Sequence, residues 1–519
     1  MRLNLGEIAT SLGCTPGKII WDGPGHVEYG PWAGLACTGA QVDSRKIQPG
    51  NLFFCLPGER TDGHDFARDA AGAGAIAIVA SRNPWIGKAP DMLDLPDPVD
   101  VADLILPPVF LVDDVRAALA RVAKCHRESC RAKVIGITGT AGKTSVKEVL
   151  AQVLAMRGRT ERNPLNLNNQ IGLPVSMLNA SADASFWVME AGISEAGDMD
   201  ELGQILRPDI AIILNVGDGH VSGLGECGVA FHKARLLDYI QPGGTAVVSL
   251  DYADLNRQVD GRIKALSRRG IQLLRFSVSS EANPGAEVQA RAAYVGFRSE
   301  PFAPVGSCSE QAGGGGIYKV WTKDFDLEVS APFRGDFGSE NVAAIVTVAV
   351  KLGLSLEEIQ SGFAQARPPQ QRLREERYPR HTLLDDSYNA NPLSAPRMIQ
   401  AARSMAGEYG QSLALVMGEM LELGAKAESA HEALGESMAA ARPVAVFWKG
   451  GHADDVLRGL TRGGYDRNFY PLSDAEEFGP LLEEADLNDV LILFKGSRSN
   501  KLERLVAVFR EKISPAGEN

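Results

Sequence analysis

The chain has 519 residues, which is too long for one hydrophobic core and predicts about three domains of roughly 100 to 250 residues each. Its 53 basic and 65 acidic residues give a formal net charge of −12, which argues against a general binder of nucleic acid or anionic membranes. Seven cysteines without a CxxC pair indicate reduced thiols and a cytoplasmic protein. The sequence has no signal-peptide pattern and no run of about 18 apolar residues, so we expect no transmembrane segment.

The first 128 residues contain short apolar runs separated by Gly, Pro and Asp. These runs are NLFFCL, AIAIVA and VFLV, and the region ends with VRAALARVAKCHRESC, whose apolar residues recur at helical spacing. The pattern predicts a small α/β domain, residues 1–128, closed by a helix.

Residues 129–368 alternate between strand-like and helix-like segments. The strand-like segments are VIGIT, FWVMEAG, DIAIILNVG and TAVVSL. Such alternation predicts a parallel sheet with helices on both faces and with ligands at the carboxyl ends of its strands. A Gly-, Ser- and Ala-rich stretch at about residues 277–316 has no clear period, and we expect it to be a surface excursion of this second domain.

A third α/β region follows a linker at Arg367–Gln371, where two prolines oppose continuation of the preceding helix. Its strand-like segments are HTLLDDSY, SLALVMGEM, PVAVFWKG and DVLILFKGS. We expect residues 369–519 to form a Rossmann-like α/β domain.

The segment VIGITGTAGKTSVKE is typical of a phosphate-binding loop. A buried strand leads into a glycine-rich turn, and a helix opens at the lysine. The glycines let backbone amides converge on an anion, the helix N-terminus favours negative charge, and a lysine can reach terminal phosphate oxygens. The spacing departs from G-x-x-x-x-G-K-[ST] at Ile137, and the alternative is a turn without a ligand. The nucleotide-binding candidates are Gly139, Thr140, Ala141, Gly142, Lys143, Thr144 and Ser145.

Three other segments of the same series carry polar groups that could complete a magnesium site with Thr144. They supply Glu190, His220 and Lys233. A single acidic residue or histidine after a strand is more often an exposed loop residue. Their succession beside a phosphate-binding loop favours a metal site, since Mg²⁺ prefers oxygen ligands. An ammonium group would repel the metal unless the amine of Lys233 were modified.

These residues resemble the Mur ligase superfamily, the ATP-dependent amide-forming enzymes of peptidoglycan precursor synthesis. The T-G-T-x-G-K-T loop matches, and Glu190, His220 and Lys233 stand at matching places. The resemblance implies catalytic roles for these three residues and Lys143, with a carbamylated Lys233. LNLNNQIGLPVSML resembles a segment near the substrate cleft, which implies substrate contacts by Asn168 and Asn169.

Other motifs favour one branch of the superfamily. DDSYNANPLS, GEMLELG followed by His431, and FKGSRSNKLE are similar to the branch that joins D-alanyl-D-alanine to UDP-N-acetylmuramoyl-tripeptide through an acyl phosphate. The D-N-P-R motif of the preceding ligase is absent from the sequence. The resemblance implies that the uridine diphosphate end meets Ser44, Arg45, Asp62 and His64. It also implies ATP contacts by Asn341, Arg372 and Asp386, and contacts to nucleotide or dipeptide by Tyr388, Asn389 and Asn391.

The chain departs from the family pattern at two places. The usual G-x-H-N-x-x-N appears as GDFGSEN, with Phe337 and Gly338 in place of His and Asn, and Arg235 replaces a glutamate after Lys233. Two alternatives stay open: a folate-type polyglutamate or cyanophycin-like ligase, and a non-enzymatic nucleotide-binding scaffold. The superfamily implies a monomer. The third residue of the tripeptide, diaminopimelate or lysine, does not follow from the sequence.

Overall fold

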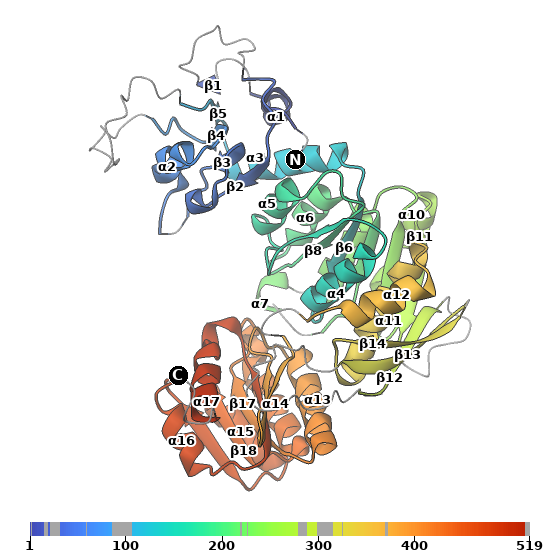
Figure 1. Ribbon diagram of the computed structural model, residues 1–519, viewed down its shortest axis with the longest axis vertical. Helices are drawn as coiled ribbons and strands as arrows, with labels where there is room; N and C mark the ends of the chain where they lie inside the picture. The colour runs from blue at the N-terminus through green and yellow to red at the C-terminus, as the bar shows by residue number, and fades with distance from the viewer. Residues whose placement is uncertain are drawn as a thin grey trace. The chain divides into compact units, whose positions relative to one another are not determined.

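The computed structural model describes residues 1, 3–14, 19–20, 32–58, 60–85, 106–217, 221–225, 227–278, 288–297, 315–323, 325–368 and 372–513. The strands form three separate sheets, which confirms the predicted series of three α/β regions (Figure 1). The chain also divides into two compact units. The first contains Met1–Gly136, Gly158–Gly192 and Asp200–Asp209, and the second contains Ile137–Arg157, Ile193–Met199 and Ile210–Asn519.

The N-terminal sheet has five strands in the order β1-β5-β4-β3-β2, all parallel to their neighbours except β1. Its strands are β1 (Ile19–Ile20), β2 (Gly39–Gln41), β3 (Asn51–Phe54), β4 (Ala77–Ala80) and β5 (Val109–Leu111). The helices here are α1 (Leu5–Leu12), η2 (Ser44–Lys46), η3 (Gly63–Phe66), α2 (Ala67–Gly72) and α3 (Val115–Ser129). The three apolar runs thus form β3, β4 and β5, and the amphipathic segment forms α3, as predicted.

The central sheet has nine strands in the order β14-β13-β12-β11-β10-β9-β6-β8-β7. They are β6 (Lys133–Thr138), β7 (Thr160–Arg162), β8 (Phe186–Glu190), β9 (Ile210–Ile213), β10 (Thr245–Ser249), β11 (Gln272–Ser277), β12 (Val288–Phe297), β13 (Gly316–Thr322) and β14 (Asp326–Ala331). Strands β9 to β12 pair in parallel, whereas β13 and β14 extend the sheet antiparallel. Strand β6, which leads into the glycine-rich loop, lies inside the sheet.

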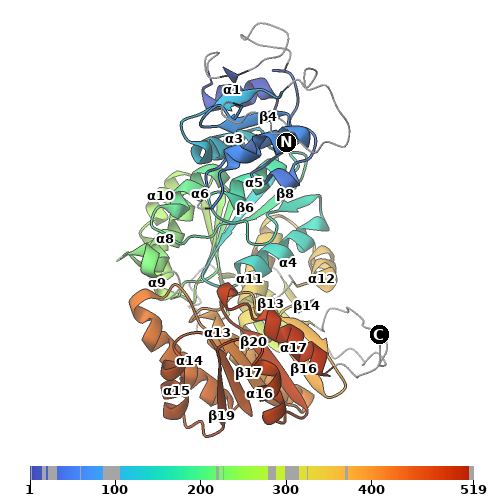
Figure 2. The ribbon, with the colours of Figure 1, turned by 90° about the vertical axis from the view of Figure 1, so that its left-hand side faces the viewer.

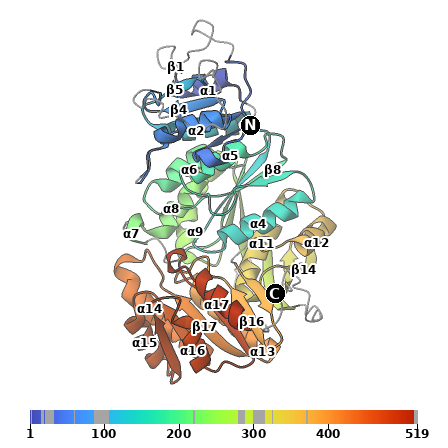
Figure 3. The same cartoon turned by 60° about the vertical axis from the view of Figure 1, so that its left-hand side comes forward.

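The helices of this region follow its strands in sequence. They are α4 (Lys143–Ala155), α5 (Gly172–Asn179), α6 (Asp198–Leu206), α7 (Val221–Leu224), α8 (Gly228–Ala234), η5 (Arg235–Tyr239), α9 (Ala253–Asp260), α10 (Ile263–Arg268), α11 (Gly335–Lys351) and α12 (Leu356–Gln365). Helices α11 and α12 pack against α4, as Figure 3 also shows. A Cβ atom at Gly362 would lie 2.8 Å from the Cα of Val153, so the close approach of α12 to α4 requires glycine there.

Part of the stretch expected to be an irregular excursion is a strand. Val288–Phe297 forms β12, which pairs with β11 on one side and β13 on the other. Ala290 and Ala292 are buried, and this alternation of period two is the feature that the Gly- and Ser-rich composition concealed. Residues 279–287 and 298–314 of the same stretch lie outside the described residues.

The C-terminal sheet has six strands in the order β15-β16-β20-β17-β18-β19, and only β15 is antiparallel to its neighbour. Its strands are β15 (Arg374–Arg377), β16 (His381–Asp385), β17 (Ser412–Gly418), β18 (Ala445–Lys449), β19 (Asn468–Leu472) and β20 (Val490–Lys495). Its helices are α13 (Ser394–Tyr409), η6 (Gly424–Lys426), α14 (Ala427–Ala441), α15 (Ala453–Arg462), α16 (Phe478–Glu484), η7 (Arg498–Asn500) and α17 (Glu503–Ile513).

Helices cover both faces of this sheet, which explains why its strands are continuous apolar runs. Leu384, Leu415 and Leu493 pack into one core with α13, α14 and α15. Leu383 and Phe494 point the other way, into a core with α16 and α17. The two sets of helices lie on opposite sides of the strands in Figure 2. No helix among the described residues is long and apolar enough to cross a lipid bilayer.

A buried ion pair joins the segment that follows the central sheet to the edge of the C-terminal sheet. Arg334, directly before α11, donates to Glu375 of β15 at 2.8 Å, and their side chains are 5% and 3% exposed. Glu375 also accepts hydrogen bonds from Arg377 at 2.6 Å and from the Tyr409 hydroxyl at 3.0 Å. A buried carboxylate with three donors ties the start of α11 to β15 and α13.

We predict that Arg334→Met lowers the free energy of unfolding by about 3 kcal/mol. This is the lower end of the cost of removing one partner of a buried pair, because Arg377 still pairs with Glu375 in the variant. Differential scanning calorimetry of the full chain checks this as a lower apparent Tm. The control is Arg380→Met, whose partner Asp489 is 59% exposed and whose loss should cost less than about 1 kcal/mol. Equal shifts in the two variants would contradict the prediction.

Candidate active site

The glycine-rich loop has the backbone geometry of an anion site. It runs from the end of β6 to α4, where Gly142 has a φ of 79° and occupies the N-cap position. A Cβ atom at Gly142 would lie 2.7 Å from Oδ1 of Asn341, so space and conformation both demand glycine. The Lys143 ammonium donates to the carbonyl oxygens of Gly139 at 2.9 Å and Thr140 at 3.4 Å. The Lys143 side chain is therefore folded back over the loop that is predicted to bind phosphate.

A residue of the neighbouring strand end, Asn215, holds the loop in place. Its Oδ1 accepts from the backbone N–H of Ala141 at 2.8 Å, and its Nδ2 donates to the Ala141 carbonyl at 3.2 Å. The Thr140 hydroxyl also bonds to the backbone of Gly217, which follows the same strand. Asn215 was not among the predicted site residues, although it ends the apolar run DIAIIL just as Thr138 ends VIGIT.

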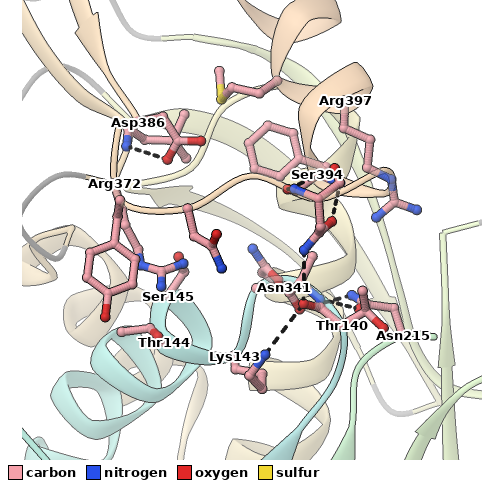
Figure 4. A pocket seen from close by; sticks show the side chains of 18 of the residues that line it. Thr140, Lys143, Thr144, Ser145, Asn215, Asn341, Arg372, Asp386, Ser394 and Arg397 are labelled. Atoms are coloured by element: carbon pink, nitrogen blue, oxygen red, sulfur yellow. Dashed lines mark hydrogen bonds between the residues drawn. The ribbon is translucent and has the colours of Figure 1, made fainter. Parts of the chain in front are cut away.

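One pocket brings together most of the residues expected to bind the nucleotide (Figure 4). On one side it is formed by the loop and α4, and on the other by the segments around the start of the C-terminal sheet. The predicted residues in its lining are Thr140, Ala141, Gly142, Lys143, Thr144, Ser145, Asn341, Arg372, Asp386, Tyr388, Asn389 and Asn391. Gly139 is not in the lining. The lining residues that were not predicted are Asn215, Phe337, Glu340, Leu373, Ser394, Arg397, Met398 and Lys495.

The two adjacent aspartates after β16 have different surroundings. Asp385 is buried and accepts from the backbone and hydroxyl of Ser387 at 3.1 and 2.6 Å, and burial raises the pKa of its carboxyl. Asp386 lines the pocket and pairs with Lys495, whose Nζ lies 2.5 Å from its Oδ2 and also donates to the Asn389 carbonyl. Lys495 belongs to the FKGS motif, so this motif and DDSYNANP meet at one ion pair.

The remaining polar residues of this segment also contribute to the pocket wall. The Arg372 guanidinium lies over the Tyr388 ring, 4.3 Å from its centroid. Asn391 accepts from the backbone N–H of Ser394, the first residue of α13, at 2.8 Å, while its Nδ2 reaches the Thr140 carbonyl at 3.4 Å. Asn391 thus combines the ordinary role of an Asn-Pro helix start with a direct contact to the phosphate-binding loop.

Packing explains the two departures at the start of α11. A Cβ atom at Gly338 would lie 2.0 Å from the Tyr318 hydroxyl and 2.7 Å from the Cβ of Phe333, so this position accepts only glycine here. Phe337 lines the pocket and packs against the apolar core of the C-terminal sheet. The positions that usually hold His and Asn therefore serve packing in this chain, whereas Asn341 keeps its place in the pocket.

The predicted metal ligands can be placed in part. Glu190 ends β8, is 1% exposed, and accepts from Asn168 Nδ2 at 2.7 Å. Thr144 lies in the first turn of α4 and is buried, as is Lys233 on α8, which is 2% exposed and so does not project into solvent. His220 lies outside the described residues. Buried oxygen donors fit a hard cation, whereas an unmodified buried amine does not, so this site stays a prediction.

Arg235, which replaces the usual glutamate, has a partner of its own. Its guanidinium lies 3.3 Å from Asp238, one turn further along the chain. Within the part of the chain that the structure describes, no three His, Cys, Asp or Glu side chains gather as a metal cluster.

The predicted uridine-site residues of the first unit form two small loops with internal hydrogen bonds. Arg45 is 85% exposed and bonds through Nε and NH2 to Asp43, the residue before Ser44. In the second loop, His64 is buried, with Nδ1 2.6 Å from Asp62 and Nε2 accepting from the backbone N–H of Ser81. Both ring nitrogens of His64 are engaged, so it shapes the loop.

Asp62 is held in its charged form by the same contacts. Partial burial opposes ionisation, but hydrogen bonds from His64 and from Arg82 at 2.7 Å lower the pKa of the Asp62 carboxyl to about 2. Asn169 likewise has a structural bond, because its side chain accepts from the backbone N–H of Gly172 at 2.8 Å at the start of α5. Asn168 contacts Glu190, one of the predicted metal ligands, directly.

His431, singled out by its motif, also supports a loop. It is fully buried, its Nε2 accepts from the Met420 N–H at 3.0 Å, and its Nδ1 donates to the Ala427 carbonyl at 2.7 Å. Burial lowers the pKa of the ring. His431 is therefore a neutral side chain that fixes the GEMLELG loop.

Comparisons with known proteins agree with this geometry. Successive stretches match the Mur ligase family catalytic domain (residues 37–155), the Mur ligase middle domain (137–349) and the Mur ligase glutamate ligase domain (371–498). The chain is 30% identical over 488 residues to the UDP-N-acetylmuramoyl-tripeptide–D-alanyl-D-alanine ligase of Escherichia coli (strain K12), which covers 92% of this chain and 95% of the relative. It is 28% identical over 471 residues to the ligase of the same name from Bacillus subtilis (strain 168), covering 90% and 92%.

Solved structures show the same relationship. MurF from Acinetobacter baumannii has a TM-score of 0.77 and 26% identity, covering 98% of this chain and 99% of that one. The fold is also that of a MurF ligase from Thermotoga maritima in complex with ADP, with a TM-score of 0.70 and 23% identity over 92% and 98% of the two chains. The chain therefore belongs to the Mur ligase family, within its branch of UDP-N-acetylmuramoyl-tripeptide–D-alanyl-D-alanine ligases.

Proposed function

We propose that this chain joins D-alanyl-D-alanine to UDP-N-acetylmuramoyl-tripeptide at the cost of ATP, forming the pentapeptide precursor of peptidoglycan, ADP and phosphate. The observation that carries the proposal is the single pocket in which the T-G-T-A-G-K-T loop faces Arg372, Asp386 and the YNANP segment. The relatives named for this activity support it, since they span nearly the whole chain.

The first step is phosphoryl transfer to the terminal carboxylate of the tripeptide. The loop amides and the N-terminus of α4 bind the phosphates, and Lys143 moves from its loop carbonyls to the transferring phosphoryl group. Arg372 binds the phosphate tail, while Asp386 and Asn341 bind the nucleoside. Tyr388, Asn389 and Asn391 frame the nucleotide and the incoming dipeptide.

The second step is attack of the dipeptide amine on the acyl phosphate, with release of phosphate. Water would hydrolyse that intermediate, so the site has to exclude solvent before the chemistry begins. The uridine diphosphate end is bound by Ser44, Arg45, Asp62 and His64, with Asn168 and Asn169 at the tripeptide. This division assigns residues 1–128 to the UDP-linked substrate, 129–368 to ATP and 369–519 to the dipeptide, in a monomer acting in the cytoplasm.

We propose that Thr144, Glu190, His220 and a carbamylated Lys233 hold Mg²⁺. The ion, when bound, neutralises charge on the transferring phosphoryl group. Carbamylation explains how a lysine that is 2% exposed can serve beside a cation, because an ammonium 4 Å from a unit positive charge is repelled by about 4 kcal/mol at an effective dielectric of 20.

The proposed activity predicts phosphate release that depends on D-alanyl-D-alanine. We expect purified protein with ATP, Mg²⁺ and UDP-N-acetylmuramoyl-tripeptide to release phosphate only when the dipeptide is added, and mass spectrometry to show the pentapeptide product. Diaminopimelate and lysine forms of the tripeptide are assayed side by side, and glutamate with a folate serves as the control. Turnover of the folate pair alone would reject the proposal in favour of a polyglutamate ligase, and no turnover with any pair would favour a scaffold.

Removal of the loop lysine should stop the reaction without unfolding the chain. We predict that Lys143→Ala lowers kcat by at least about a hundredfold, the scale of losing one electrostatic donor to the transition state. Lys264→Ala, which removes an exposed lysine of α10, is the matched control and should leave kcat unchanged. Near-normal turnover of Lys143→Ala would show that the loop does not act on phosphate.

The modified lysine is tested by chemical rescue. We predict that Lys233→Ala loses activity and regains part of it when a short-chain carboxylic acid is added, because the acid supplies the missing anionic oxygens. Lys233→Arg keeps the cation but cannot form the carbamate, so it should be inactive and not rescued. Full activity of Lys233→Ala without an acid would exclude a carbamate role.

A further inference from the structure

Four side chains that the proposed chemistry does not use form a hydrogen-bonded cluster around a buried glutamate beside the phosphate-binding loop. They are Asn215, Tyr252, Glu340 and Arg397, here called the Glu340 network. Glu340 on α11 is 4% exposed, and its Oε1 accepts from the Tyr252 hydroxyl at 2.6 Å. Its Oε2 accepts from Asn215 Nδ2 at 2.9 Å and from Arg397 NH1 at 3.3 Å. Arg397 NH2 donates to the Tyr252 hydroxyl at 2.8 Å.

Glu340 determines which way the Asn215 amide points. A carboxylate can only accept hydrogen bonds, so the Asn215 side chain must turn its nitrogen toward Glu340. This leaves Oδ1 toward the backbone N–H of Ala141, 2.8 Å away, and the second Nδ2 hydrogen toward the Ala141 carbonyl. The middle of the phosphate-binding loop is thereby held from both sides by an amide whose orientation is set by Glu340.

The cation of the network comes from a different part of the second unit. Arg397 lies in the first turn of α13, just after the YNANP segment, whereas Glu340 lies in α11 behind the loop. Figure 4 shows Arg397 and Ser394 of α13 on the wall above Asn215 and Thr140. Burial raises the pKa of the Glu340 carboxyl, and although burial opposes the charge of Arg397, Glu340 and Tyr252 raise the pKa of its guanidinium. The carboxylate therefore depends on α13 for its counter-charge.

We propose that Glu340 and Arg397 are positioning residues that couple the docking of α13 to the conformation of the phosphate-binding loop through Asn215. When α13 is docked, the loop amide of Ala141 is held by Asn215. When it is not, Glu340 loses its cation, and the buried carboxylate that orients Asn215 is left without a counter-charge. The loop is thus set for phosphoryl transfer only when the segment that carries the YNANP residues is in place. The activity test of this role rests on the proposed ligase function. The hydrogen-exchange test of the loop does not depend on that function.

The structural readout is hydrogen exchange of the loop in the full chain without nucleotide. We expect the peptide covering residues 139–146 to exchange about tenfold faster in Arg397→Met than in the wild type, because a charge-assisted hydrogen bond is lost. Tyr252→Phe, which removes only a hydroxyl, should give a smaller increase in the same peptide. Arg403→Met is the matched control, since Arg403 is an exposed residue of α13 that bonds to Ala440 outside the network. Unchanged exchange in both network variants would overturn the proposal.

The activity readout separates coupling from general destabilisation. We expect Arg397→Met to lower kcat by about 30-fold with little change in the KM for D-alanyl-D-alanine. The double variant Glu340→Gln/Arg397→Met should recover part of this loss and slow the loop exchange, because it removes the unpaired carboxylate. A double variant more impaired than Arg397→Met would overturn the proposal. If the wild type shows no ligase activity, the proposed function fails while the exchange measurements still test the coupling.

Discussion

The pocket depends on one buried carboxylate, that of Glu340. A carboxylate removed from water needs donors around it, and here they come from Asn215, Tyr252 and Arg397. Asn215 carries the phosphate-binding loop and Arg397 belongs to α13, so the two walls of the pocket share one acceptor. The shape of the glycine-rich loop is consequently not a property of its own residues alone. It also reflects how α13 is docked.

A second ion pair also joins the segment around α11 to the C-terminal region, with the cation and the carboxylate exchanged between the two sides. Arg334, which precedes α11, pairs with Glu375 of the C-terminal sheet, whereas Arg397 of that region pairs with Glu340 of α11. Each side therefore supplies one cation and one carboxylate to the other. The Arg334–Glu375 pair is buried, and removing one partner of such a pair costs about 3–5 kcal/mol, whereas the Arg397 side chain is 35% exposed. The two pairs thus favour one docked arrangement over others that would leave charges unmatched.

The strands and the phosphate-binding loop could be predicted because their information is local. Runs such as LILF are apolar throughout, since both faces of their sheet are covered, and the loop is one contiguous motif. The Glu340 network could not be predicted, because Asn215 and Glu340 are 125 positions apart and Tyr252 and Arg397 are 145 apart. No local pattern marks a glutamate inside α11 as a partner of an arginine in α13. Strand β12 was missed for another reason, because glycine and serine around it masked a short alternation.

Motifs identify loops more reliably than they identify the side chain that meets a ligand. Asp385 and Asp386 are adjacent and chemically identical, yet Asp385 bonds to Ser387 while Asp386 reaches the pocket and Lys495. Successive residues at a strand end point to opposite faces, so one of two neighbouring aspartates faces the protein interior and the other faces the pocket. His64 follows the same principle, since its Nδ1 meets Asp62 of its own loop and its Nε2 accepts from the backbone N–H of Ser81 after β4. A motif of several polar residues therefore contains two kinds of residue. Some hold the loop in its conformation, and others face the ligand.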